Sequence, residues 1–148
     1  NSATASNLLD DYEEGTWTPV IKSNANTIST SGGVTLAQYT KIGRTVHISL
    51  SIQATTTSGT IDNSGDHIRV TGLPFAASGT SGTRHIGTQL THYIGFSTTE
   101  ENVVGLIGAG ESQIEFVEHD GGDTGYSSAR LESVGGNSYL QYSAVYYV

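Results

Sequence analysis

The sequence predicts one all-β domain, an antiparallel β-sandwich of jelly-roll type preceded by a short N-terminal lead-in segment. The run from Thr45 to Gln53 alternates apolar and polar residues, which is typical of a strand with one face on a core. Gly, Ser and Thr make up 57 of the 148 residues and divide the chain into short apolar stretches. No apolar period of 3.6 residues persists for three turns. Short strands with frequent glycine turns favour a sandwich over any helical fold.

The expected elements follow each other closely along the chain. Residues 1–15 are expected to be the lead-in, and residues 16–148 a single domain. In the lead-in, residues 8–15 have the composition of a helical turn, which is too short to be stable unless it leans on the domain or on a neighbouring chain. A strand is expected at residues 17–21, at a sheet edge because Pro19 lacks a ladder donor. Further strands are expected at residues 34–42, 45–53, 67–70, 84–90, 92–96, 103–107, 113–119, 129–134 and 138–148, with tight turns at 43–44, 108–110 and 135–137.

Composition excludes several classes of protein. Apolar residues make up 35% of the chain and recur with a period of two, which a disordered chain would not show. The net charge is −8 and the six cations are scattered, so neither a nucleic acid nor an anionic membrane surface is an expected partner. No apolar run approaches the roughly 20 residues that span a bilayer, so no membrane insertion is expected. Because the sequence starts at Asn1 and not at Met, we expect it to be part of a longer or processed protein.

The sequence offers no catalytic or metal site. The carboxylates at residues 10–14 and 100–101 are expected to be solvated surface charge. The loops at residues 62–66 and 120–123 carry Asp, Asn and Gly that could hold Ca²⁺, but the spacing differs from a calcium loop and turns need the same residue types. No histidine pair has helical spacing, and Cys is absent. No nucleophile elbow, phosphate loop or dinucleotide motif occurs. We therefore expect no enzyme, no cofactor and no bound metal.

The terminal strand is rich in tyrosine on both of its faces. Alternation places Tyr139 and Tyr147 on one face and Tyr142 and Tyr146 on the other. Such a strand is either central in a sandwich or packed with its outer face on another subunit. The candidates for contacts between chains are Leu8, Leu9, Tyr12, Tyr142 and Tyr146.

Aromatic rings near turns and edges are candidates for sugar stacking, because the ring face is apolar and the polar atom bonds hydroxyls. The candidate ligand-binding residues are Trp17, Tyr93 and Tyr126, together with the loop carboxylates Asp120 and Asp123. Each ring is also a plausible structural residue. His47 lies on the polar side of its strand, facing either solvent or a neighbouring subunit.

Three motifs in order resemble a pattern found near the C-terminal domain of bacteriophage tail fibres and tailspikes. They are residues 9–19 (LDDYEEGTWTP), 38–44 (QYTKIGR) and 72–75 (GLPF), and residues 138–147 resemble the final aromatic strand. Residues 76–133 match only in general character. The resemblance implies a jelly-roll-like homotrimer at the distal end of a virion tail appendage, attached to upstream fibre or spike domains. It carries no catalytic residues.

Two functions follow from this resemblance, and a third is weaker. The domain would bind host surface polysaccharide or lipopolysaccharide, or it would act only as a structural cap that holds three chains in register. A hydrolase or esterase acting on glycans lacks a nucleophile motif in this sequence.

Overall fold

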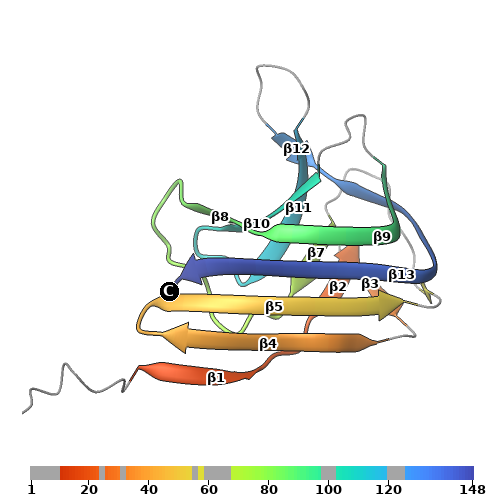
Figure 1. Cartoon of the computed structure of the whole chain (residues 1–148). Helices are drawn as coiled ribbons and strands as arrows, with labels where there is room; N and C mark the ends of the chain where they lie inside the picture. The colour runs from red at the N-terminus through yellow and green to blue at the C-terminus, as the bar shows by residue number, and fades with distance from the viewer. Residues whose placement is uncertain are drawn as a thin grey trace, which may run out of the picture.

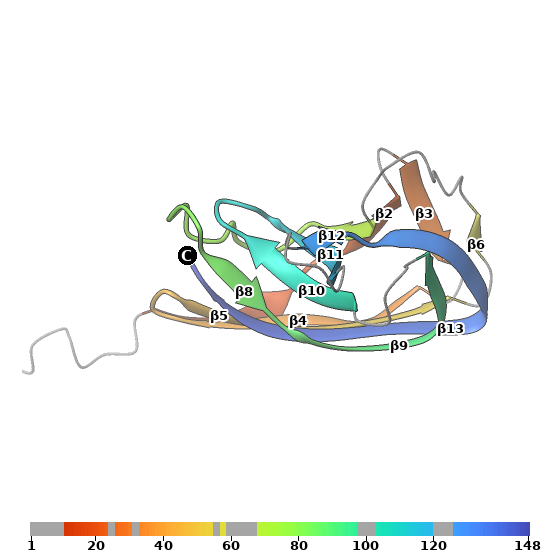
Figure 2. The same cartoon turned by 90° about the horizontal axis from the view of Figure 1, so that it is seen from above.

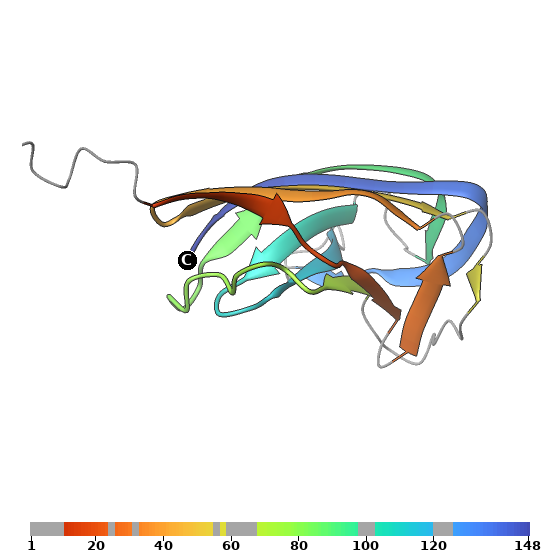
Figure 3. The ribbon, with the colours of Figure 1, turned by 90° about the horizontal axis from the view of Figure 1, so that it is seen from below.

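The computed structural model describes residues 11–23, 26–30, 33–54, 57–58, 68–97, 103–119 and 126–148. In these residues the chain forms two antiparallel sheets stacked as a β-sandwich, which confirms the predicted fold class (Figures 2 and 3). None of their elements is a helix long and apolar enough to span a membrane. The fold therefore has two layers with one core between them.

Five strands form the first sheet, called sheet A here, in the order β1-β4-β5-β13-β9 (Figure 1). Their bounds are β1 Tyr12–Thr16, β4 Val34–Ile42, β5 Thr45–Ala54, β13 Arg130–Tyr147 and β9 Thr88–Ser97. The second sheet, sheet B, has the order β6-β3-β2-β7-β11-β10-β8, and β12 pairs with β11. Its bounds are β6 Thr57–Ser58, β3 Asn26–Thr30, β2 Val20–Ser23, β7 Ile68–Thr71, β11 Gln113–His119, β10 Val103–Gly108, β8 Arg84–Ile86 and β12 Tyr126–Ser128.

The alternating strand β5 organises sheet A. It pairs with β4 on one side and with β13 on the other. Its apolar residues Val46, Ile48, Leu50 and Ile52 are at most 3% exposed, whereas His47 on the opposite face is exposed. The predicted turn between β4 and β5 is also present, with Gly43 at a φ of 57° that favours glycine. Period-two alternation thus fixes which face of the sheet is buried.

The core lies between the two sheets and is completed by rings that cross it. From sheet A, Tyr142 makes an edge-to-face contact with Phe116 of sheet B, at 6.2 Å between ring centroids. Tyr39 of β4 makes a similar contact with Phe75, at 5.4 Å. Such pairs add to the stabilisation that burial of apolar area already gives.

The C-terminal strand differs from its prediction. A strand at residues 129–134, a hairpin turn at 135–137 and a second strand were expected, but Arg130–Tyr147 is a single 18-residue strand. Its register with β9 shifts between Leu131 and Ser133 and between Val134 and Tyr139. Figure 2 shows β13 curving from the layer of β12 into sheet A. Gly135 and Gly136, expected to form the hairpin turn, therefore lie within a bent and irregularly paired strand.

The N-terminal prediction also needs correction. Tyr12–Thr16 is a strand, although a helical turn was expected over residues 8–15, of which 8–10 lie outside the described structure. It forms because Tyr12 to Thr16 pair in register with Ile42 to Gln38 of β4. The expected strand at residues 17–21 is β2, and β2 lies between β3 and β7, so it is not an edge strand. Pro19 precedes β2, where its missing N–H costs no ladder bond.

Candidate functional site

The outer face of sheet A is a polar surface built from the residues that alternate with the core. From β5 it takes Thr45, His47, Ser49, Ser51 and Gln53, and from β13 it takes Tyr139, Gln141, Ser143, Val145 and Tyr147. Small hydroxyl side chains in the middle of the face leave room above the sheet. On this face the ring Nε2 of His47 lies 3.1 Å from the Ser143 hydroxyl, which joins the two central strands.

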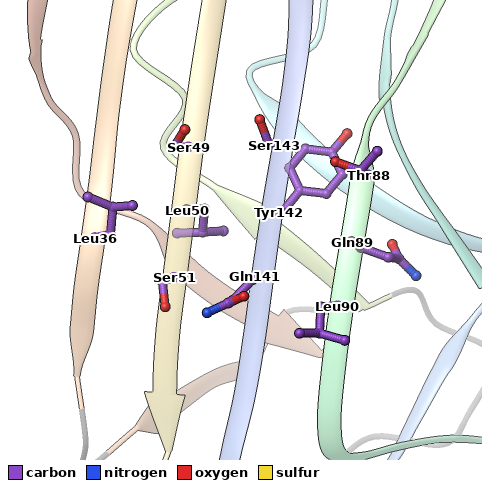
Figure 4. A pocket seen from close by; sticks show the side chains of 10 residues that line it. All are labelled: Leu36, Ser49, Leu50, Ser51, Thr88, Gln89, Leu90, Gln141, Tyr142 and Ser143. Carbon is purple, nitrogen blue, oxygen red and sulfur yellow. The ribbon is translucent and has the colours of Figure 1, made fainter.

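A groove of about 440 Å³ crosses the middle of this face (Figure 4). One row of paired residues runs across four strands in the order Leu36, Ser51, Gln141 and Leu90. The next row contributes Ser49, Ser143 and Thr88. The groove therefore has two leucines at its sides and hydroxyl and amide groups between them.

The lining residues and the volume define what the groove can do chemically. Its volume lies within the roughly 300–1,000 Å³ of small-molecule sites. The described residues of its lining include no carboxylate and no imidazole. Hydroxyl and amide groups can donate and accept hydrogen bonds, and the leucines can contact apolar ligand surface. The groove is suited to a neutral polyol.

Exposed apolar side chains gather at the end of the same face where β4 turns into β5. Tyr12 of β1 pairs with Ile42 of β4, and these residues are 49% and 52% exposed. Val145 of β13 lies across from His47 in the next row and is 48% exposed. We call Tyr12, Ile42 and Val145 the outer apolar patch. Apolar surface of this kind on a sheet face is typical of a contact with another chain.

The structure describes one side chain among the predicted ligand-binding residues, that of Trp17. Trp17 is 9% exposed and belongs to the core, so its ring face is not presented to a ligand, and that expectation is corrected. Trp17 directly follows β1, and its main-chain N–H bonds the oxygen of Ala37 of β4 at 3.1 Å. Tyr93 and Tyr126 lie on β9 and β12, and their side chains are outside the described structure. Asp120 and Asp123 also fall outside it.

The predicted interface tyrosines of β13 are core residues. Tyr142 and Tyr146 are 2% and 0% exposed, and their hydroxyls donate hydrogen bonds to the main-chain oxygens of Gly105 at 3.2 Å and Phe75 at 3.0 Å. Burial raises the pKa of Tyr146 to about 12. Both rings are buried within the single chain, so they are not available for the contacts between chains that the sequence suggested.

The remaining interface candidates have different outcomes. Tyr12 is exposed, in agreement with a contact surface, whereas Leu8 and Leu9 lie outside the described residues. Sequence reasoning missed Leu36, Leu90, Ile42 and Val145. The signal that could have found the first two is an apolar residue on the polar side of an alternating strand.

Metal ligands do not cluster in the part of the chain that the structure describes. No group of three or more His, Asp or Glu side chains there has the proximity that a metal ion needs. The two loops considered for Ca²⁺, residues 62–66 and 120–123, are outside that part.

Comparison with known proteins gives one structural relationship. No protein-family profile matches the chain, and no curated protein matches it. Among solved structures, the chain is similar to the crystal structure of the Dettilon tailspike protein (gp208), with a TM-score of 0.61 and 16% sequence identity. The similarity covers 91% of this chain and 23% of the tailspike chain, so this chain spans less than a quarter of the length of the protein it resembles. Its fold is one that a phage tailspike also contains.

Proposed function

We propose that this chain is a domain of a phage tail fibre or tailspike, carried on the virion, that forms a homotrimer and binds host surface polysaccharide or lipopolysaccharide. The observation that supports this most is the similarity of 91% of the chain to a segment of a tailspike. Upstream fibre or spike domains are its expected covalent neighbours. We assign the domain a binding role without a catalytic step.

The groove on sheet A supports the glycan part of the proposal. Sugar rings have apolar C–H faces and hydroxyl edges, and a site for them needs both kinds of contact. Leu36 and Leu90 lie three strand spacings apart, about 14 Å, which accommodates more than one sugar ring. Gln141, which is exposed between them, offers an amide that can both donate and accept.

A glycan array of bacterial surface polysaccharides, probed with the isolated chain, tests this function. We expect binding to a restricted set of polysaccharides, and we expect the free chain to compete with phage adsorption to hosts that carry them. An array without hits, together with adsorption that does not change when the domain is removed, would contradict the proposal.

The outer apolar patch favours a second function, a structural cap that holds three chains in register. A trimer would bury Tyr12, Ile42 and Val145, which each remain about half exposed in the single chain. Burial of this surface is compatible with glycan binding, because the groove lies farther along the same face. Sedimentation of the free chain tests the trimer that both functions expect, and a trimer that binds no polysaccharide would leave the cap as the function.

A further inference from the structure

A second hollow, of about 460 Å³, opens at the end of the sandwich where the turn between β4 and β5 lies. We call it the end hollow. Sheet A contributes Arg44, Thr45 and Tyr147 to its walls, and sheet B contributes His85 of β8. The segment between β7 and β8 adds three hydroxyl side chains, those of Ser78, Thr80 and Thr83.

Main-chain hydrogen bonds hold this wall of hydroxyls against sheet A. The N–H of Ser78 bonds the oxygen of Tyr147 at 2.7 Å, and the N–H of Val148 bonds the oxygen of Arg44 at 2.9 Å. Within the segment, Thr83 donates its hydroxyl to the oxygen of Thr80 and its N–H to the same atom at 3.2 Å. The walls are therefore positioned before any ligand arrives.

Charge distinguishes the end hollow from the rest of the molecule. The chain carries 14 acidic residues against six basic ones, yet the described side chains that line this hollow include a guanidinium and no carboxylate. The Nε of Arg44 donates to the main-chain oxygen of Val148 at 2.9 Å. Among the described residues its other two nitrogens make no hydrogen bond or ion pair. Asp11 approaches this turn through its main chain, which bonds Gly43, but its side chain is not part of the lining.

An exposed ring stands beside this cation. Tyr147 is 52% exposed and rests edge-to-face on the buried His85, at 5.6 Å between ring centroids. The contact with His85 orients the ring while leaving about half of the side chain accessible. A ring face of this kind stacks on a sugar, and a planar guanidinium pairs bidentately with a carboxylate or a phosphate.

We propose that the end hollow binds a sugar that carries a negatively charged group, either a carboxylate or a phosphate. Arg44 takes the charged group, Tyr147 stacks on the ring, and the hydroxyls of Ser78 and Thr83 bond the sugar hydroxyls. At physiological ionic strength the screening length is about 8 Å, so carboxylates that lie farther from Arg44 than this oppose the binding only weakly. This assignment rests on the proposed glycan-binding function and specifies an acidic residue in the glycan.

Titration of the full chain with glucuronic acid, glucose 1-phosphate and glucose tests the assignment, with chemical shifts or heat as the readout. We expect at least one acidic sugar to bind about tenfold or more tightly than glucose, and the two acidic arms identify the preferred group. Arg44→Gln should weaken that binding by about tenfold or more, and Arg44→Lys by less, because lysine keeps the charge without the planar fork. Added salt should weaken the binding further.

Matched variants show where the sugar binds. Lys22→Gln removes a cation on β2 of sheet B, outside the lining, and Gln141→Ala alters the groove on sheet A. Both should leave binding of the acidic sugar unchanged. Tyr147→Leu should weaken binding of the acidic sugar while Arg44 stays in place. This second variant tests the site even if Arg44→Gln disturbs the turn between β4 and β5. A melting temperature for each variant checks the fold.

Three results would overturn the assignment. One is equal binding of glucose and the acidic sugars, and a second is binding that survives both Arg44→Gln and Tyr147→Leu. Absence of any acidic-sugar binding at millimolar concentration also overturns it. In each of these cases, polysaccharide binding that depends on Gln141 would leave the proposed function standing, so the two failures are distinguishable.

Discussion

The ring of Tyr142 lies against Gly105, and its hydroxyl donates a hydrogen bond of 3.2 Å to the main-chain oxygen of that glycine. A Cβ at Gly105 would lie 2.5 Å from the ring, and a Cβ at Gly87 would overlap the same ring. Strand β10 and the residue between β8 and β9 thus approach one tyrosine so closely that no side chain fits. We expect Gly105→Ala to lower the free energy of unfolding by about 1–3 kcal/mol, because extra volume in a packed core forces its neighbours apart. Urea unfolding at neutral pH measures this loss.

Gly79→Ala is the control for that variant. A Cβ at Gly79 would meet nothing within 4 Å, so its substitution should change the free energy of unfolding by less than about 0.5 kcal/mol. Equal losses for Gly79→Ala and Gly105→Ala would show that the effect comes from the glycine backbone and not from contact with Tyr142.

Alkaline pH should unfold the protein through its two buried tyrosines. Burial raises the pKa of Tyr146 to about 12 and holds that of Tyr142 well above its usual range. A tyrosine in the unfolded chain has a pKa of about 10, so above that pH the unfolded state binds fewer protons than the folded state. The contribution of these hydroxyls to stability is therefore complete below pH 10 and is lost as pH rises through the folded pKa. Urea unfolding at a series of pH values should show this decline.

Tyr146→Phe separates this effect from general alkaline denaturation. The variant loses the hydrogen bond to the oxygen of Phe75, which costs about 0.5–1.5 kcal/mol at neutral pH. Its free energy of unfolding should then fall less steeply above pH 10 than that of the parent. Tyr147→Phe alters a ring that is 52% exposed and should change the free energy of unfolding at neutral pH by less than about 0.5 kcal/mol. If the free energy of unfolding of Tyr146→Phe fell with pH as steeply as that of the parent, Tyr146 would not contribute to the alkaline unfolding.

Trp17 should report on the core and not on the ligand. It is the one tryptophan of the sequence and is 9% exposed, so its emission should resemble that of a buried indole and resist a soluble quencher. Saturation with a bound polysaccharide should leave this emission unchanged. Trp17→Ala should cost about 3–5 kcal/mol of stability, as for other buried aromatic rings. A shift of this emission on ligand binding would show that Trp17 lies at the ligand site after all.

The alternation of apolar and polar residues predicted the strands whose burial it determines. The strand at residues 34–42 has the predicted bounds, and the one at 45–53 is one residue longer, because period-two alternation reads directly as one buried face. Strand β1 was missed because its formation depends on pairing with β4, more than 20 residues away. The glycine pair of β13 was read as a hairpin because the same residues serve turns and bent strands.

The candidate site was less predictable than the fold. The groove joins Leu36, Ser51, Leu90 and Gln141, which are adjacent only because four strands align in register. The end hollow likewise combines Arg44 with His85 and Tyr147, from separate parts of the sequence. A sequence shows which residues of a strand share a face, but it does not show how the strand is aligned with a distant partner strand. Sequence reasoning therefore favoured tyrosines that the structure places in the core.

Glycan binding in the groove should depend on Gln141 and not on Gln38. Both are exposed glutamines on the outer face of sheet A, but only Gln141 belongs to the groove lining. Loss of one or two hydrogen bonds predicts that Gln141→Ala weakens binding to an array-selected polysaccharide by about tenfold. Gln38→Ala should bind as the parent does. Titration calorimetry with the purified variants measures both, and equal affinities would place the glycan elsewhere on the molecule.

A charge in the outer apolar patch should break the trimer. Ile42 is 52% exposed and pairs with Tyr12 at the outer edge of sheet A, so a trimer that buries these two side chains would desolvate any carboxylate placed there. We expect Ile42→Glu to raise the concentration for half-dissociation by at least about tenfold, as seen by sedimentation velocity, with the fold of each chain retained. Ile86→Glu places the same charge on β8 of sheet B, at a side chain that is 67% exposed, and should leave the trimer intact. If the parent chain is monomeric at micromolar concentration, the patch has another partner; if Ile86→Glu dissociates the trimer and Ile42→Glu does not, the contact between chains lies along the β8 edge.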